Sequence, residues 1–385
     1  MAEKVDYAAL KKGGFMRQKQ KGCFSLRLAV VGGNLTAENI KTVAEVAEKY
    51  GHGYVHMTSR QGIEIPFIKV EDINEVKEEL AKGGVGTGVC GPRVRTITAC
   101  QGAAICPSGC IDTYTLAKEL DARYFGRELP HKFKFGVTGC QNNCLKAEEN
   151  DVGIKGGMTV ECNHDDCIQC GVCVKACREG ALRMEDGKIV IDREKCNNCA
   201  RCVKSCPTDA WVGESGYIVS FGGLFGNKIY KGEQIVPIIR DKETLFRVTD
   251  AAISFFEKHA NAGERFRLTL ERVGKEEFKK EVQAAYNQII NERERGTSGQ
   301  SSAGYGGYGG SAGGQDFWGS FGGFGGYGSG YGGYGSQQQN QQNQYQDEDS
   351  LKFRAAANYI NAGSYTEALH VLDSIANRNA QWYYL

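Results

Sequence analysis

Residues 91–106 read GPRVRTITACQGAAIC, and residues 129–144 read LPHKFKFGVTGCQNNC. Each segment ends in a cysteine pair, namely Cys100 and Cys106 in the first and Cys140 and Cys144 in the second. The pairs are about one βα unit apart, so they belong to two loops that the fold must bring together. Four thiolates at these spacings suit one [4Fe-4S] cluster.

The intervening sequence supports this interpretation. It has a helical pattern over residues 111–124 and a strand-like run over residues 134–138. Two alternatives remain for the four cysteines, which are structural cysteines and a tetrahedral zinc site. Cysteine pairs that bind zinc are usually closer together in the sequence.

Length and composition exclude several classes of protein. With 385 residues, of which 41% are hydrophobic and 24% charged, the chain is expected to form two or three domains. Its sixteen cysteines fall in metal-ligand spacings, and residues 1–14 contain no apolar signal segment, so we expect a reducing, cytoplasmic location. No run approaches the roughly 18 to 20 apolar residues of a membrane span. A net charge of +1 gives no argument for nucleic acid as a partner.

The sequence before the first cysteine pair alternates between strand and helix patterns. The expected elements are a strand over residues 23–31, a helix capped by Thr36 and ending near Tyr50, strands over 53–60 and 62–68, and a helix over 70–81. This order predicts a βαββα unit. The unit is rich in basic residues for its size, and a solvated charged face is the alternative to a functional role for them.

Residues 162–206 form a dense cysteine block, in which the pattern C-x2-C-x2-C-x3-C occurs twice. In such a duplicated motif the fourth cysteine of each run ligates the other cluster. The predicted ligand sets are Cys167, Cys170, Cys173 and Cys206 for one [4Fe-4S] cluster, and Cys177, Cys196, Cys199 and Cys202 for a second. The block resembles a bacterial two-cluster ferredoxin, with Arg178 where a proline is usual. Zinc binding is the alternative.

Four cysteines remain outside these sets, and we expect them to be buried small side chains rather than ligands. They are Cys23, Cys90, Cys110 and Cys162.

The α/β pattern resumes after the cysteine block, which is therefore expected to be inserted in a larger domain. The predicted elements are a strand over residues 216–223, a glycine turn over 222–226, a strand over 234–239, an amphipathic helix over 242–259, and a closing helix that begins within residues 264–282 and frays near Arg295.

Over roughly residues 10–290 these motifs resemble the sulfite and nitrite reductase family. The inserted block makes the chain similar to the siroheme subunit of anaerobic or dissimilatory sulfite reductases. The resemblance implies an α+β fold, with a ferredoxin-like βαββα domain, a siroheme/[4Fe-4S] α/β reductase domain and an inserted 2[4Fe-4S] ferredoxin domain. The implied cofactors are siroheme and three [4Fe-4S] clusters, with Cys144 also serving as the axial thiolate that bridges its cluster to the siroheme iron.

The same resemblance implies roles for basic residues. Those expected at the distal face, where the substrate binds, are Arg60, Arg95, Lys132 and Lys134. Those expected to bind the siroheme carboxylates are Arg17, Lys19, Lys21, Arg27 and Arg93. Guanidinium groups would hold a small oxyanion in a fork geometry, and lysines could supply protons as S–O bonds break. Ordinary surface charge is the alternative.

The expected function is the six-electron reduction of sulfite to sulfide by siroheme, with electrons entering through the ferredoxin block. Reduction of nitrite to ammonia is the closest alternative, and a non-catalytic iron–sulfur electron-transfer subunit is another. Well-known assimilatory members carry two copies of the reductase repeat, whereas this sequence has one, so a second copy in another chain is expected to complete the pocket. No flavin or nicotinamide module is visible, and a separate protein or subunit is therefore expected to donate the electrons.

The C-terminal sequence is of another kind. Residues 296–347 hold Gly/Tyr/Phe repeats and a Gln/Asn-rich run without lysine or arginine, which predicts a disordered linker. Residues 348–385 show two short amphipathic helices, like one tetratricopeptide hairpin. Together these segments are similar to the C-terminal part of some bacterial J-domain proteins, and no catalytic role is assigned to them.

The predicted domain boundaries follow from these patterns. They are 1–85 for the ferredoxin-like half-domain, 86–161 and 211–295 for the two parts of the reductase domain, 162–210 for the inserted ferredoxin domain, 296–347 for the linker and 348–385 for the helical hairpin.

Overall fold

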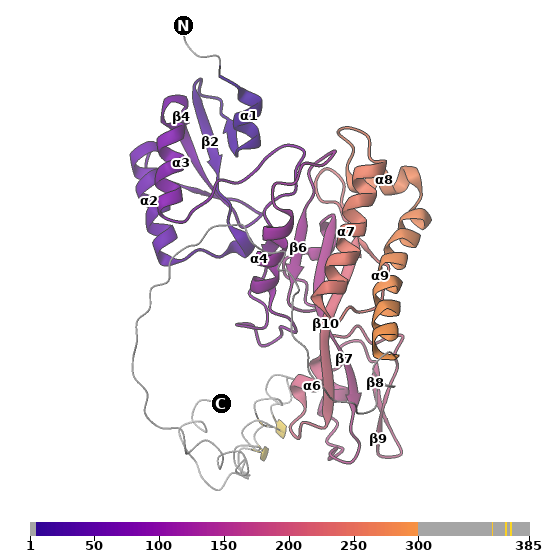
Figure 1. Cartoon of the computed structure of the whole chain (residues 1–385). Helices are drawn as coiled ribbons and strands as arrows, with labels where there is room; N and C mark the ends of the chain where they lie inside the picture. The colour runs from indigo at the N-terminus through magenta and orange to yellow at the C-terminus, as the bar shows by residue number, and fades with distance from the viewer. Residues whose placement is uncertain (1–4, 299–355, 357–365, 368–369, 372–385) are drawn as a thin grey trace, which may run out of the picture.

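The computed structural model describes residues 5–298, 356, 366–367 and 370–371 (Figure 1). These residues contain a four-stranded sheet near the N-terminus, a five-stranded central sheet and a two-stranded hairpin. No helix in the described part of the chain is long and apolar enough to cross a membrane. The mixed α and β composition that the sequence predicts is confirmed.

The N-terminal unit is an antiparallel sheet covered by two helices. Its elements are α1 (Tyr7–Lys12), β1 (Phe15–Arg17), β2 (Cys23–Arg27), η1 (Val31–Gly33), α2 (Ala37–Tyr50), β3 (His56–Met57), β4 (Ile63–Lys69), η2 (Val70–Asp72) and α3 (Ile73–Lys82). The strand order is β1-β2-β4-β3, so the predicted βαββα unit is present with β1 as an additional edge strand. As predicted, Thr36 caps α2, and its hydroxyl accepts a hydrogen bond from the Asn39 amide at 3.1 Å.

Side chains in β2 alternate between the two faces of this sheet. Phe24 and Leu26 are buried in the core with the helices, whereas Ser25 and Arg27 lie on the other face and are half-buried. This alternation makes Arg27 available to the reductase part of the molecule.

The central sheet has the strand order β11-β10-β7-β6-β5. Its strands are β5 (Thr98–Ala99), β6 (Phe135–Thr138), β7 (Val152–Cys162), β10 (Trp211–Phe221) and β11 (Glu233–Gln234). The pairs β5/β6 and β6/β7 are parallel, and the pairs β7/β10 and β10/β11 are antiparallel. Four helices and one short 3-10 turn, η3 (Ala147–Glu149), accompany the sheet, the helices being α4 (Thr113–Tyr124), α7 (Lys242–His259), α8 (Phe266–Val273) and α9 (Lys275–Ser298).

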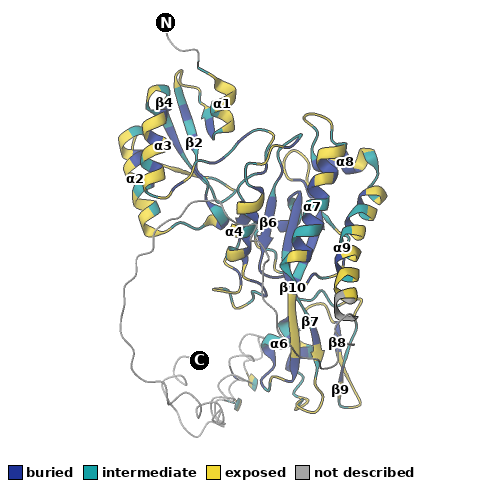
Figure 2. Ribbon diagram, in the orientation of Figure 1, coloured by how far each residue is buried: buried dark blue, intermediate teal, exposed yellow. Residues whose placement is uncertain are grey.

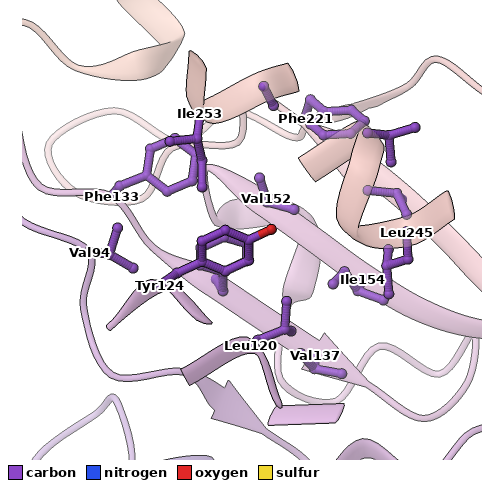
Figure 3. Packing of buried hydrophobic residues seen from close by; sticks show 14 of the residues in the cluster. Val94, Leu120, Tyr124, Phe133, Val137, Val152, Ile154, Phe221, Leu245 and Ile253 are labelled. Carbon is purple, nitrogen blue, oxygen red and sulfur yellow. The ribbon is translucent and has the colours of Figure 1, made fainter. Parts of the chain in front are cut away.

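The largest core lies between this sheet and the helices (Figures 2 and 3). Phe133 is fully buried at its centre, with its ring centroid 5.3 Å from that of Phe266 and 5.5 Å from that of Phe135. The extended segment Lys132–Phe135 alternates lysine and phenylalanine, so the aromatic rings enter the core and the lysines lie on the opposite side. The core therefore fixes the strand from which both lysines project.

The cysteine block is inserted at the tip of a two-stranded arm. Strands β7 and β10 pair along their whole length, from Val152 opposite Phe221 to Cys162 opposite Trp211. Between the strand ends lie α5 (Val172–Ala176), β8 (Leu182–Glu185), β9 (Lys188–Ile191) and α6 (Arg201–Ser205), which Figure 1 shows at the far end of the arm. The block has its own small core, in which Leu182, Ile189 and Trp211 are buried among cysteines.

In the N-terminal unit, the strands predicted over residues 23–31 and 53–60 are shorter, at Cys23–Arg27 and His56–Met57. Three features of the reductase part also differ from the sequence prediction. Strand β7, with three glycines among eleven residues, was not predicted. The strand predicted over residues 234–239 is shorter, because only Glu233–Gln234 pair as a strand and Ile239 forms an isolated bridge to Tyr217. The prediction of a single closing helix is wrong, because Gly274, at φ +110°, separates α8 from α9.

The predicted linker (296–347) and helical hairpin (348–385) lie almost entirely outside the described residues.

Candidate iron–sulfur and anion site

The sheet brings the two cysteine loops together. Cys100 directly follows β5 and Cys140 follows β6 by one residue, and these strands are parallel neighbours in which Ala99 is opposite Val137. Both loops therefore leave the same edge of the sheet. The Cys100 amide donates to the Val137 carbonyl oxygen at 3.0 Å, and the Gly139 amide donates to Cys100 Sγ at 3.1 Å.

The four predicted cluster cysteines share one environment. Burial raises the pKa of Cys140, and the proximity of Cys106, Cys100 and Cys144 raises it further. A raised thiol pKa opposes thiolate formation, and the positive charge of bound iron would reverse that effect. Within the described residues, no three Cys, His, Asp or Glu side chains converge on one point as ligands of a single ion would. The donor set fits an iron–sulfur cluster, and the role of each thiol stays a prediction.

Close backbone packing holds the second loop in place. Strand β7 passes the Gly139 carbonyl so tightly that a Cβ atom on Gly156 would lie 2.2 Å from that oxygen. Only glycine allows this approach, which explains part of the glycine content of β7.

The inserted block gathers its cysteines in two groups. Proximity to Cys170 and Cys206 raises the pKa of Cys173, although burial is the larger cause. The second group lines a small cavity and consists of Cys177, Cys196, Cys199 and Cys202. In both groups one cysteine comes from the other run, as the duplicated motif predicts.

The four cysteines left unassigned differ in their surroundings. Cys90 and Cys110 are buried, as expected, whereas Cys23 and Cys162 are only half-buried. The expectation of burial is therefore wrong for these last two. Cys162 is the last residue of β7. Burial raises the pKa of its thiol to about 12, and Cys167 contributes to this shift.

The second cysteine group of the insert faces the reductase loops. Cys199, Cys140 and Cys144 line one cavity of about 780 Å³. The Lys204 ammonium group of α6 donates to the carbonyl oxygens of Pro107 at 2.7 Å and Gly109 at 2.5 Å. These contacts fix the insert against the loop that carries Cys106, so two of the predicted cluster sites lie next to each other.

Another cavity, of about 270 Å³, lies between the N-terminal unit and the central sheet. Five cationic residues line it, namely Arg27, Arg60, Arg95, Lys132 and Lys134, and no acidic residue is among the described residues of its lining. They come from four separate segments of sequence. Such a concentration of like charge is stable only where an anion binds or a nearby carboxylate offsets it.

Arg60 lies at the floor of this cationic cavity, on the loop between β3 and β4. Its guanidinium donates to Asn150 Oδ1 at 2.9 Å and to the Thr96 carbonyl oxygen at 3.3 Å. Burial lowers its pKa to about 10, so the group stays charged at neutral pH. The adjacent Gln61 donates to and accepts from the backbone of Ala99 at 2.8 and 2.9 Å, which ties this loop to the residue before Cys100.

Arg95 also lines the cavity. It donates to the carbonyl oxygens of Val89 at 2.5 Å and Gly91 at 3.0 Å, and burial lowers its pKa. Arg27 is paired with Glu64 at 2.6 Å and also contacts Cys90 Sγ at 3.2 Å. Both arginines are thus held rigidly, which favours a preorganised anion site.

Both lysines of the cavity have lowered pKa values. Burial lowers the pKa of Lys134 to about 8, and the positive charges of Arg60 and Arg265 contribute to the shift. Burial also lowers the pKa of Lys132. A lysine with a pKa near neutrality can both bind an anion and give up a proton.

Four predicted siroheme-binding residues lie elsewhere. Arg17 stacks on Tyr7, and Arg93 pairs with Glu128 at 2.5 Å. Lys19 and Lys21 lie in the turn between β1 and β2, and none of the four is among the residues that line the cavity. Their roles toward a cofactor stay predictions.

Sequence reasoning missed three residues behind the cavity, which are Asn150, Asp151 and Arg265. Asp151 is fully buried and accepts from the Lys134 amide at 2.9 Å and from Arg265 at 3.3 Å. The sequence gives little indication of Asn150 and Asp151, because they follow the Cys144 loop and belong to no recognisable motif. Arg265 is more than 100 residues further along the chain.

The five cations that line the cavity are suited to bind carboxylates and a small oxyanion, which fits a large anionic group such as siroheme. Among the described residues, Arg93 Nε and Arg265 Nε are buried atoms without a hydrogen-bond partner, and neither residue lines the cavity. Leaving a buried donor unpaired costs about 1–3 kcal/mol.

Two family models match the chain. The model described as "Nitrite and sulphite reductase 4Fe-4S domain" matches residues 90–290, more than half of the chain, and "Nitrite/Sulfite reductase ferredoxin-like half domain" matches residues 16–83. Both matches end before the C-terminal segment, so its likeness to J-domain proteins has no support from them.

Among curated relatives, the coenzyme F420-dependent sulfite reductase of Methanocaldococcus jannaschii is 34% identical over 70% of this chain and 44% of its own length. An uncharacterized protein of the same organism is 34% identical over 65% of this chain and 86% of its own length. One subunit of the anaerobic sulfite reductase of Salmonella typhimurium is 33% identical over 46% of this chain and 58% of its own length. The chain thus spans about half the length of the two named sulfite reductases.

The fold is similar to that of dissimilatory sulfite reductase I, with a TM-score of 0.58 at 22% identity over 68% of this chain and 69% of the other. The sequence matches and the gathered cysteine loops agree, and the chain belongs to the nitrite and sulphite reductase family of siroheme and iron–sulfur oxidoreductases.

Proposed function

We propose that the chain catalyses the six-electron reduction of sulfite to sulfide with siroheme and iron–sulfur clusters. The observation that carries this proposal is the cavity lined by five cations beside the loop of Cys100. Sulfite is a small oxyanion, and fixed guanidinium and ammonium groups are the donors that bind such anions strongly. Siroheme, when bound, supplies the redox chemistry, and the protein supplies position, charge and protons.

The roles of the cavity residues follow from their contacts. Arg60 and Arg95 are held by backbone carbonyl groups, so they bind the oxyanion without reorganising. Lys134, with its pKa near 8, supplies protons as oxygen leaves the substrate as water. Bisulfite takes up six electrons and six protons to give hydrosulfide and three water molecules, so the site must deliver protons repeatedly.

Electrons are proposed to pass through the inserted block. The group that contains Cys199 shares a cavity with Cys140 and Cys144, and no cysteine of the group that contains Cys167 lines that cavity. The path then runs from the Cys167 group to the Cys199 group and on to the cluster of the reductase loops. Three clusters, a separate electron donor and a second copy of the reductase in another chain complete this proposal. A cytoplasmic location stays a prediction.

Sulfite is favoured over nitrite by the relatives. The nitrite reductase large subunit of Klebsiella oxytoca is 30% identical over 36% of this chain, a smaller share than either sulfite reductase covers. A carrier without siroheme would leave the cationic cavity without an anion, which is electrostatically costly.

The test is turnover of the anaerobically purified protein with reduced methyl viologen. Sulfite turnover above nitrite turnover is expected, with siroheme absorption bands and about thirteen irons per chain, twelve from three [4Fe-4S] clusters and one from siroheme. Iron and sulfide without tetrapyrrole would identify a carrier instead. Turnover of nitrite alone would assign the chain to the other reaction of the family.

A further inference from the structure

A buried threonine hydroxyl at the base of the cysteine loops has no hydrogen-bond partner within the described part of the chain. Thr138 ends β6, two residues before Cys140, and is 1% exposed. Its Oγ1 atom is fully buried, and the structure shows neither a donor nor an acceptor for it among the described residues. A buried hydroxyl without a partner is costly, so its presence here requires an explanation.

The other buried threonines of the described chain all use their hydroxyl groups as donors. They are Thr98, Thr113, Thr244, Thr249 and Thr269. Thr98 is the most direct comparison, because it lies two residues before Cys100 at the start of β5 and donates to the Phe135 carbonyl oxygen at 3.0 Å. Thr138 has the equivalent place before Cys140 on the neighbouring strand, yet its hydroxyl has no such acceptor.

The Thr138 side chain lies on the face of the sheet that the second cysteine loop covers. Side chains alternate along β6, and Val137 enters the main core, so Thr138 lies on the other face. On that face a Cβ atom on Gly136 would lie 3.2 Å from Ala147 Cα, so the segment after Cys144 packs against β6 there. The hydroxyl is therefore buried on the side from which the cluster cysteines are held.

The side chains beside Thr138 on this face are already paired. Lys155 of β7 is its register partner, and the Lys155 ammonium group is itself a donor that pairs with Glu148. The Glu148 carboxylate also accepts from the Asn143 side-chain amide at 3.3 Å. An acceptor for the Thr138 hydroxyl is thus expected from a bound group rather than from a neighbouring side chain.

The residue next to Thr138 already donates to a sulfur atom, because the Gly139 amide lies 3.1 Å from Cys100 Sγ. Sulfur atoms of an iron–sulfur cluster accept hydrogen bonds, and such bonds change its reduction potential. We propose that Thr138 is a cofactor-binding residue, whose hydroxyl donates to a sulfur atom of the cluster held by the reductase loops and stabilises its reduced form. This inference rests on the proposed function for the presence of that cluster.

The first measurement is the reduction potential of the clusters in the intact protein. Thr138→Val keeps the shape of the side chain and removes the hydroxyl group. The reduced cluster carries one more negative charge, so the variant should lower the equilibrium constant for its one-electron reduction about tenfold. That change is a fall of about 59 mV in midpoint potential, measured by anaerobic redox titration with electron paramagnetic resonance. The two clusters of the insert should keep their potentials and serve as internal standards.

Two further variants separate this effect from a change of packing. Thr138→Ser keeps the hydroxyl group and should restore the potential toward that of the unmodified protein. Thr98→Val is the matched control, because it removes a hydroxyl at the equivalent place of β5 that already donates to a backbone carbonyl group. It should leave all three potentials unchanged.

The second measurement detects the hydrogen bond itself. Pulsed electron paramagnetic resonance after exchange into D₂O reports the exchangeable deuterons that are bonded to the sulfur atoms of a reduced cluster. Thr138→Val should lose one such deuteron signal, whereas Thr138→Ser and Thr98→Val should retain it.

An unchanged potential or an unchanged deuteron signal in Thr138→Val would overturn the inference. If neither Thr138→Val nor Thr138→Ala retains the cluster, its retention in Thr138→Ser supports the hydroxyl contact, and its loss there overturns it. A protein that holds the cluster but turns over no sulfite would refute the proposed function, whereas the potential and the deuteron signal would still decide the role of Thr138.

Discussion

Replacement of Arg60 by alanine tests whether the cationic cavity binds the substrate. The guanidinium is held by Asn150 Oδ1 at 2.9 Å and by the carbonyl oxygens of Thr96 and Phe135 at 3.3 and 3.5 Å. These contacts leave its position defined before any ligand arrives. A charge-assisted contact contributes about 1.5–3 kcal/mol, and about 1.4 kcal/mol is tenfold in rate, so Arg60→Ala should lower sulfite turnover by about 10- to 150-fold.

The loss should be greater in kcat than in KM if the contact strengthens as oxygen leaves sulfur. Arg60→Lys keeps the charge but lacks the planar guanidinium fork, so its sulfite turnover should lie between those of the unmodified protein and Arg60→Ala. The assay is sulfite turnover with reduced methyl viologen, divided by siroheme and iron content. The matched control is Arg127→Ala, which removes an exposed arginine that is paired with Glu257 at 2.7 Å, and it should retain full turnover.

Full turnover of Arg60→Ala at normal cofactor content would refute the reasoning, because the cavity would then not be the substrate site. Loss of siroheme together with turnover would instead give Arg60 a role in cofactor binding. A fall in turnover of the Arg127→Ala control would show that the assay responds to any change of charge.

Three other changes have defined outcomes. Because burial lowers the pKa of Lys134 from 10.5 to about 8, the unfolded chain binds more protons between these values and stability rises with pH across that window. Lys134→Met should therefore raise the melting temperature at pH 7, flatten this pH dependence and abolish most turnover, whereas a lower melting temperature at pH 7 would contradict the sign. Phe133→Ala should lower the free energy of unfolding by about 3–5 kcal/mol, measured by denaturant titration, because its fully buried ring packs at the centre of the core. Cys199→Ser should slow electron uptake from a protein donor yet keep turnover with methyl viologen, and loss of siroheme in this variant would show that the two parts do not fold independently.

Much of the fold was predictable because its signals are local. The capping residue Thr36 and the helix from Lys242 to His259 follow from short patterns, and both are as predicted. Strand β7 was missed because its glycines give weak strand propensity and its stability comes from pairing with β10 along its whole length. The break at Gly274 depends on one residue with positive φ, which a helical pattern does not reveal.

For the site, too, local signals were predictable from the sequence and long-range contacts were not. Lys132 and Lys134 were found through the resemblance to the reductase family, and the cysteine groups were found because their spacing is a motif. Asp151 and Arg265 were missed because their importance is a property of contacts across 114 residues of sequence. The charge balance of the cavity is thus visible only in three dimensions.

The arm formed by β7 and β10 has a consequence for how such chains change over evolutionary time. The insert leaves the arm at Cys162 and returns at Trp211, and these residues are direct partners across the two strands. The adjacent Asn163 amide donates to the Ala210 carbonyl oxygen at 2.7 Å, so the two ends of the insert are already closed like the base of a hairpin. A tight turn joining Cys162 to Trp211 would complete an ordinary hairpin and leave the register of the sheet intact. The inserted cysteine block can therefore be removed as a single unit without a change of strand register, and a version of this chain without it should still fold as a reductase domain.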